Sequence, residues 1–139
     1  MPVILGDRRR PLRVLVADDN HDILTLFCEL LKMNDFEVIA QARSGKEAVK
    51  LYAQRKPDIV FLDVVMPDGD GTYALEKIRE VNPDAIVIAV TSDLTPATSE
   101  RLHQLHASAV IYKPFDINEL IKVVVSLLPA GMKQVKFSH

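Results

Sequence analysis

The feature that most constrains the fold of this chain is the alternation of five short apolar runs with five segments of helical periodicity. A continuous apolar run of a few residues is typical of a strand that is buried on both faces. Apolar residues three and four positions apart are instead typical of an amphipathic helix. The runs expected to form strands are Leu12–Ala17, Glu37–Ala42, Ile59–Asp63, Ala85–Val90 and Ala109–Tyr112.

A segment with helical spacing follows each of these runs. The first helix is expected to begin at a cap provided by Asn20 or Asp22 and to end at Asn34-Asp35. Its apolar residues at helical spacing are Ile23, Leu24, Phe27, Leu30 and Leu31. The second helix is expected from Ser44-Gly45 to Pro57-Asp58. The third follows a flexible loop, Asp68-Gly69-Asp70-Gly71, carries Leu75, Ile78 and Val81 inward, and ends at Asn82-Pro83. The last two are expected from about Pro96 to His106 and from about Asp116 to Leu128. Such alternation predicts an α/β fold, with a doubly wound parallel sheet covered by helices on both faces.

The length and the charge of the chain limit what it can do. A chain of 139 residues fits one domain, expected at 12–128, with a leader at 1–11 and a tail or the start of a linker at 129–139. The net charge of −2 creates no field that would favour nucleic acid or a membrane surface, and Arg8-Arg9-Arg10 is expected to be a solvated part of the leader. Cys28 is the only cysteine and lies among apolar residues, so we expect a packed core side chain in a reducing compartment. No apolar run is long enough to span a membrane, and we therefore expect a cytoplasmic domain without a nucleic-acid or membrane partner.

Four of the five expected strands end in a polar residue that can take part in chemistry. The first strand ends at Asp18-Asp19, the third at Asp63, the fourth at Thr91 and the fifth at Lys113. In a parallel sheet these residues meet at one edge, where crowded carboxylates would resist joint ionisation. Mg²⁺ would resolve this repulsion because it prefers oxygen ligands and keeps several waters.

This set of residues suits an oxyanion with three peripheral oxygens. A metal ion, the hydroxyl of Thr91 and the ammonium of Lys113 would each hold one oxygen, which is the arrangement that phosphoryl transfer requires. Asp63 would then be a carboxylate nucleophile that forms an acyl phosphate. Taken alone, Asp63 would be a turn residue at a strand end, Thr91 a helix cap and Lys113 a surface charge, but their joint presence favours the chemical interpretation. Asp68 and Asp70 are instead expected to be cap or turn residues.

At these positions the chain resembles the receiver domain of two-component response regulators, the CheY-like family. The residues that carry the resemblance are Val-Ala-Asp-Asp at 16–19, Leu-Asp-Val-Val-Met-Pro at 62–67, Gly71, Thr91-Ser92 and Lys-Pro-Phe at 113–115. The resemblance implies a flavodoxin-like sheet with strand order 2-1-3-4-5 and five helices. It also implies a signalling domain rather than an enzyme that turns over an external substrate.

The same resemblance implies specific roles for the residues at the strand ends. Asp63 would accept a phosphoryl group from the phosphohistidine of a sensor histidine kinase or a phosphotransfer protein. Mg²⁺ would be held by Asp19, Asp63 and the backbone carbonyl of Val65, with Asp18 acting through water. Thr91 and Lys113 would hold phosphoryl oxygens, and the Lys113–Pro114 peptide would be cis. Phosphorylation would alter a surface for a downstream effector protein or the chain's own output domain, and a homodimer through the fourth helix, fifth strand and fifth helix is a further expectation.

Some features depart from the pattern of that family. Many relatives carry an aromatic residue three positions before the lysine, where this chain has Val110, and we expect Tyr112 to face away from both Lys113 and Val110.

In the last helix, Ile117, Leu120, Ile121, Val124 and Leu128 are expected to face the core, whereas Val123 and Val125 widen the apolar stripe toward a partner surface. His103 and His106 have a spacing that can bind a metal on one helix, although exposed histidines are commoner.

Two alternative functions remain open at this point. Val110 favours a constitutive binding or dimerisation module of the same fold that switches little on phosphorylation. A metal-dependent phosphohydrolase is disfavoured because its nucleophile commonly follows the first strand and no insertion here is large enough for a substrate cap. Dinucleotide binding is disfavoured as well, since no glycine-rich loop follows the first strand.

Overall fold

Five strands and five helices alternate along the part of the chain that the computed structural model describes, residues 11–66 and 70–129. The strands are β1 (Arg13–Ala17), β2 (Glu37–Ala42), β3 (Ile59–Asp63), β4 (Ile86–Thr91) and β5 (Ala109–Tyr112). The helices are α1 (His21–Met33), α2 (Gly45–Arg55), α3 (Gly71–Val81), α4 (Pro96–Gln104) and α5 (Ile117–Leu127). Three expectations lie outside the described residues: the leader with Arg8-Arg9-Arg10, the turn at Asp68, and the tail at 130–139.

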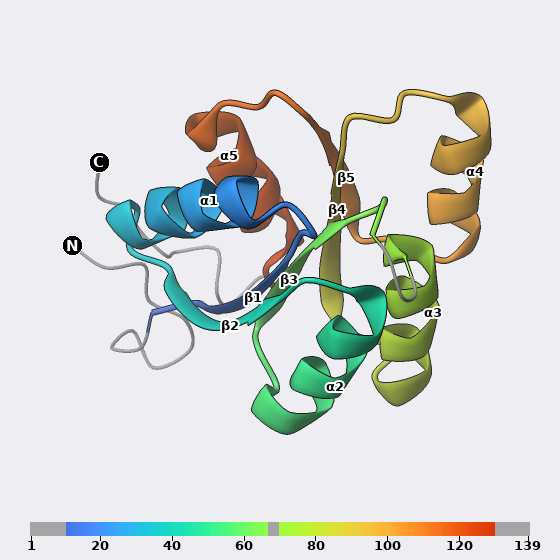
Figure 1. Cartoon of the computed structure of the whole chain (residues 1–139), viewed down its shortest axis with the longest axis horizontal. Helices are drawn as coiled ribbons and strands as arrows, with labels where there is room; N and C mark the ends of the chain where they lie inside the picture. The colour runs from blue at the N-terminus through green and yellow to red at the C-terminus, as the bar shows by residue number, and fades with distance from the viewer. Residues whose placement is uncertain (1–10, 67–69, 130–139) are drawn as a thin grey trace.

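The strands form one parallel sheet, as their alternation with helices predicted, and its order β2-β1-β3-β4-β5 is the one that the family resemblance implied (Figure 1). The chain starts in β1, moves outward to β2, and then crosses to β3, β4 and β5 on the other side. The reversal brings the ends of β1 and β3 together at the centre of the sheet, because Ala17 pairs with Leu62. In open parallel sheets, ligands bind where the strand order reverses. The residues that follow Ala17 and Leu62 therefore occupy the place where a binding site is expected.

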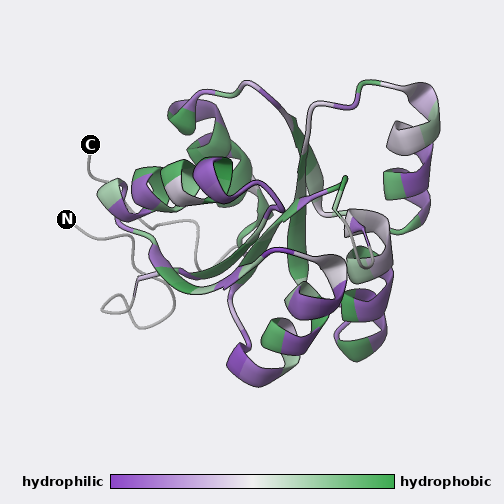
Figure 2. Cartoon of the chain, viewed as in Figure 1, coloured by the Kyte–Doolittle hydropathy of each residue, from purple (hydrophilic) through white to green (hydrophobic). Residues whose placement is uncertain are grey.

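The helices cover both faces of the sheet and divide the core into two clusters. On one face, α1 and α5 pack against side chains such as Val16, Phe61 and Val90. On the other face, α2, α3 and α4 pack against Leu15, Leu62 and Ala89. The strands are hydrophobic along most of their length, whereas α2 and α3 alternate between hydrophobic and hydrophilic residues (Figure 2). The fold is therefore the predicted doubly wound α/β sheet.

Each helix begins at a polar side chain that accepts a backbone N–H of the first turn. These capping residues are Asn20, Ser44, Asp70, Thr95 and Asp116. Such a side chain satisfies one of the amide groups that a helix leaves without an intrahelical partner. The first cap is Asn20 rather than Asp22, and the expectation that Asp70 is a cap residue is confirmed.

Several boundaries and orientations differ from the sequence predictions. Strand β4 extends to Thr91, one residue beyond its expected end. Val81 was expected to face inward, but its side chain is 59% exposed. The reason is that α3 ends at this residue, beside an open hollow between the ends of α2 and α3. Ile23 is 42% exposed on the surface of α1. Helix α4 ends at Gln104, and His106 follows it with a φ of 61°, so His103 and His106 do not have the helical spacing that a metal pair would need.

The last helix also corrects an expectation. Val123 and Val125 are half-buried and pack against the core cluster on the α1 and α5 face. Packing against the core therefore accounts for at least part of the width of the apolar stripe on α5. Cys28 is buried in the same cluster, and burial raises the pKa of its thiol to about 11, as expected of a packed core side chain. None of the described helices has both the length and the apolar character needed to cross a membrane.

Candidate functional site

The carboxyl ends of the strands bring three carboxylates together. Asp18 and Asp19 follow β1, and Asp63 is the last residue of β3, so the adjacency of these two strands determines their proximity. One carboxylate oxygen of each residue lies within 4.8 Å of the others. Three oxygen ligands at this separation are the donor set that a hard divalent cation such as Mg²⁺ prefers. The residues present therefore fit the predicted metal ion.

Asp18 is the most constrained of the three carboxylates. It is 3% exposed, and its Oδ1 accepts the backbone N–H of Asn20 at 2.9 Å. Its Oδ2 accepts Lys113 Nζ at 3.1 Å. Asp19, by contrast, is exposed at the rim. The ion pair with Lys113 connects the end of β1 to the end of β5, and two strands, β3 and β4, lie between them in the sheet.

Lys113 also faces Asp63. The distance from Lys113 Nζ to Asp63 Oδ2 is 3.6 Å, so one ammonium group serves two carboxylates. The backbone N–H of Lys113 donates to the Thr91 carbonyl at 2.9 Å, which extends the β4–β5 pairing to the site. The Lys113–Pro114 peptide bond is cis, which confirms the sequence prediction.

The surroundings of Asp63 make ionisation of its carboxyl less favourable than in water when no metal is bound. Its Oδ1 accepts the backbone N–H of Val65 at 3.3 Å, and its side chain is 13% exposed. Burial raises the pKa of this carboxyl to about 6, with Lys113 opposing the increase and the neighbouring Asp18 adding to it. A cation that binds among these carboxylates would favour the ionised form and lower this pKa.

This carboxyl should make the metal-free protein less stable as the pH rises. The pKa of Asp63 is about 6 in the folded protein and 3.8 ordinarily, so its contribution to stability is complete below about pH 4 and is lost as the pH rises through about 6. After discounting for solvent screening, we expect a loss of roughly 1–2 kcal/mol in the free energy of unfolding. Urea unfolding in EDTA at about pH 4 and about pH 7 would measure it, with Asp63→Asn as the reference that lacks this carboxyl. An equal loss in both proteins would assign the pH dependence to other groups.

Thr91 completes the predicted set. It is 1% exposed at the end of β4, and its Oγ1 accepts the backbone N–H of Asp93 at 3.0 Å. Helix α4 is capped by Thr95, so Thr91 does not have the cap role considered for it. Val65, whose carbonyl was the predicted backbone ligand, is 65% exposed beside Asp63.

Sequence reasoning named Gly71 among the residues that carry the family resemblance and placed it in a flexible loop, but assigned it no role of its own. This residue begins α3, and its N–H donates to the Val64 carbonyl at 2.7 Å. A Cβ at this position would lie 2.2 Å from the carbonyl oxygen of Asp63, closer than any side chain can approach. The lack of a side chain at Gly71 therefore allows α3 to start directly against the backbone of Asp63, and the glycine-rich loop before α3 is the sequence signal that marks this close approach.

The placement of Tyr112 is a second correction. Val110 and Tyr112 are two residues apart on β5 and so share a face, whereas Tyr112 was expected to face away from Val110. In the pairing of β4 with β5, Ala89 lies beside Val110 and Thr91 lies beside Tyr112. Val110 is partly buried against the α2, α3 and α4 cluster, while Tyr112 is 40% exposed.

Comparisons with known proteins agree with this geometry. The family model described as the response regulator receiver domain matches residues 14–125. The chain is 36% identical over 113 residues to a chemotaxis protein CheY of Listeria monocytogenes, covering 81% of this chain and 95% of that protein. It is 35% identical over 126 residues to the transcriptional regulatory protein PdtaR of Mycobacterium tuberculosis, covering 88% of this chain but 60% of that protein.

A solved structure is similar as well. The CheX-CheY-BeF3-Mg complex from Borrelia burgdorferi matches with a TM-score of 0.83 and 29% identity, covering 89% of this chain and 94% of the matched chain. Receiver domains bind Mg²⁺ at an acidic pocket, and this chain has an acidic cluster made of Asp18, Asp19 and Asp63. The family match covers most of the chain, and the sheet order and the acidic cluster agree with it. The chain therefore belongs to the receiver domains of response regulators, the signalling domains of two-component systems.

Proposed function

We propose that this chain is a phosphoacceptor switch in which Asp63 receives a phosphoryl group from a phosphohistidine. The observation that carries the proposal is the position of Asp63, which lies between two further carboxylates and the ammonium of Lys113. A carboxylate oxygen of Asp63 would form a bond to phosphorus as the bond from phosphorus to the histidine nitrogen breaks. The electron pair of that bond would return to the imidazole, and the product would be an acyl phosphate on Asp63.

The other residues of the site would position the phosphoryl group and neutralise its charge. Lys113 Nζ would hold one phosphoryl oxygen. The Thr91 oxygen accepts the N–H of Asp93, so the proton of this hydroxyl remains available to donate to a second phosphoryl oxygen. Positioning and charge neutralisation are the main contributions that a protein makes to phosphoryl transfer.

Mg²⁺ would be held by Asp19, Asp63 and the carbonyl of Val65, with Asp18 acting through water. When bound, the ion would supply positive charge that offsets the charge on the phosphoryl oxygens. The raised pKa of Asp63 supports this assignment, because burial makes its negative charge costly and a bound cation would offset that cost. The chain would assist only its own phosphorylation and dephosphorylation, and the switch would occupy residues 12–128.

A protein rather than a small molecule is the expected phosphodonor. An open, mainly apolar hollow of about 300 Å³ lies beside the site, between α1 and the segment that follows β5. It is lined by Ile23, Leu26, Phe27, Leu30, Lys113, Pro114 and Phe115. Leu26 is 70% exposed there, and exposed apolar patches mark sites of protein association. A sensor histidine kinase or a phosphotransfer protein would present its phosphohistidine from this side.

The output of the switch would be a protein surface. The CheY from Borrelia burgdorferi was solved in complex with CheX, BeF3 and Mg, which supports a second protein as a partner of this chain. The chain's own output domain, or a second copy bound through α4, β5 and α5, is the other expected partner, and Tyr112 is exposed on that face. Val110 is the observation that favours the alternative, a constitutive binding module, because an aliphatic side chain there cannot act as the aromatic relay of many relatives.

The test is phosphorylation by a small donor that contains a phosphorus–nitrogen bond. Incubation with phosphoramidate and Mg²⁺ should add one phosphoryl group per chain, measured by intact-protein mass spectrometry. The adduct should be lost in mild base and retained in acid, as expected of an acyl phosphate, and EDTA should prevent its formation. No adduct with Mg²⁺ present, or an adduct that withstands base, would contradict the proposal. Equal affinity for a partner with and without the adduct would favour the constitutive module.

A further inference from the structure

The connection from Thr91 to helix α4 runs through a chain of hydrogen bonds. Thr91 Oγ1 accepts the N–H of Asp93 at 3.0 Å. Asp93 Oδ1 accepts the N–H of Thr95, the cap of α4, at 2.8 Å. Asp93 Oδ2 accepts the hydroxyl of Thr98, in the first turn of α4, at 2.6 Å. These bonds hold the pKa of Asp93 below its ordinary value, so the carboxylate stays ionised and its hydrogen bonds are charge-assisted.

We propose that Thr98 is a positioning residue that acts through Asp93 on Thr91, and that this hydrogen-bonded chain couples the occupancy of the site to helix α4. The inference deepens the function proposed above and rests on it. It supplies a route from the site to a surface that does not require an aromatic side chain at Val110. When the Thr91 hydroxyl turns toward a phosphoryl oxygen, the amide of Asp93 must follow its acceptor or lose it. Either outcome would change the backbone of Asp93, the residue whose carboxylate accepts hydrogen bonds from Thr95 and Thr98.

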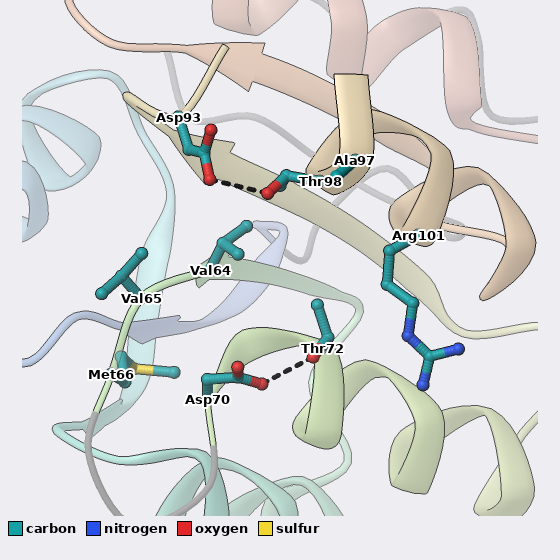
Figure 3. A pocket seen from close by; sticks show the side chains of 9 residues that line it. All are labelled: Val64, Val65, Met66, Asp70, Thr72, Asp93, Ala97, Thr98 and Arg101. Carbon is teal, nitrogen blue, oxygen red and sulfur yellow. Dashed lines mark hydrogen bonds between the residues drawn. The ribbon is translucent and has the colours of Figure 1, made fainter. Parts of the chain in front are cut away.

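The packing of α4 leaves this helix free to respond. Leu102 is the one buried residue of α4, whereas α1 buries Leu24, Phe27, Cys28 and Leu31. An element with few buried apolar contacts moves at a low free-energy cost. A hollow of about 350 Å³ separates the first turn of α4 from the start of α3, so the turn can shift without displacing the core (Figure 3). The loop at Asp93 and α4 can therefore act as the two-state element that a switch requires.

The opposite wall of the same hollow provides a matched control. There the hydroxyl of Thr72 donates to Asp70 at 2.6 Å, the same distance as from Thr98 to Asp93 (Figure 3). Asp70 caps α3, just as Asp93 supports the cap of α4, but its hydrogen bonds run to Thr72 and Tyr73 in the first turn of α3 rather than toward Thr91. Replacing Thr72 with valine removes an equivalent threonine–aspartate bond without breaking the chain to Thr91.

The test compares wild type with Thr98→Val, Thr98→Ser and Thr72→Val by amide NMR, with Mg²⁺ and beryllofluoride as the phosphoryl mimic. We expect the ligand to shift the amide of Val64, next to Asp63, in all four proteins. We expect it to shift the amides of Thr95 and Ser99 in wild type, Thr98→Ser and Thr72→Val. In Thr98→Val the shifts at Thr95 and Ser99 should fall at least threefold while the shift at Val64 remains.

Each alternative outcome is decisive. Undiminished shifts at Thr95 and Ser99 in Thr98→Val would overturn the proposed coupling and leave the phosphoacceptor function intact. An equal loss in Thr72→Val would also overturn it, because any weakened cap beside the hollow would then have the same effect. No shift at Val64 in wild type would contradict the phosphoacceptor function itself, and the coupling with it.

Discussion

Replacing Asp63 with asparagine should reduce phosphorylation to the background level, a loss of at least about a hundredfold, because an amide cannot act as the carboxylate nucleophile. The same change should make the metal-free protein more stable at neutral pH by roughly 1–2 kcal/mol, since it removes an ionised carboxylate from a buried cluster. The two effects have opposite signs, so loss of phosphorylation cannot be attributed to unfolding. Phosphoramidate labelling and urea unfolding of the same preparation would measure both.

Asp84→Asn is the matched control for this variant. Asp84 is exposed in the turn before β4, away from the carboxyl ends of the strands. The control should be labelled like wild type and should not gain stability. Labelling of Asp63→Asn at the wild-type rate would show that another residue accepts the phosphoryl group.

Replacing Lys113 with methionine should slow phosphorylation about 10²–10³-fold, the usual effect of removing one donor from a site that stabilises developing charge. Lys113 Nζ lies 3.1 Å from Asp18 and 3.6 Å from Asp63, so its loss also removes the positive charge that these ion pairs give the buried carboxylate of Asp18. We expect the metal-free variant to lose about 1–3 kcal/mol of unfolding free energy at neutral pH. Saturating Mg²⁺ should restore part of this loss, because a cation among the carboxylates replaces the missing charge.

Lys122→Met removes a lysine from the exposed surface of α5 and is the control for a general change in charge. It should leave both the labelling rate and the stability close to wild type. Initial rates of labelling at saturating Mg²⁺ would compare the two variants. A Lys113→Met protein that is destabilised but labelled at the wild-type rate would give Lys113 a structural role only.

The sheet and the members of the site could be predicted because both follow from local patterns. Five apolar runs separated by helical segments leave few topologies other than a parallel sheet, and a parallel sheet brings its carboxyl ends to one edge. Asp63 and Thr91 are the last residues of their strands, and Lys113 directly follows its strand. Their proximity therefore requires only the correct sheet order. The distances among Asp18, Asp63 and Lys113 confirm that three of the predicted side chains are close together.

The remaining features depend on contacts that are distant in sequence or on element ends. Val81 has the right spacing to face inward, but α3 ends at this residue and leaves it exposed. Val123 does not fit the main apolar stripe of α5, yet it packs against the core because neighbouring elements supply a partner. The chain of hydrogen bonds from Thr91 to Thr98 depends on the conformation of the loop between β4 and α4, which apolar periodicity does not specify.

The position of the phosphoryl group tests the central claim most directly. Acyl phosphates are reduced by borohydride, which converts a phosphorylated aspartate to homoserine while leaving free carboxylates unchanged. After labelling with phosphoramidate and Mg²⁺, peptide mass spectrometry should find homoserine at position 63 and aspartate at positions 18 and 19. Homoserine at Asp18 or Asp19 with Asp63 unchanged, or at none of the three, would contradict the account.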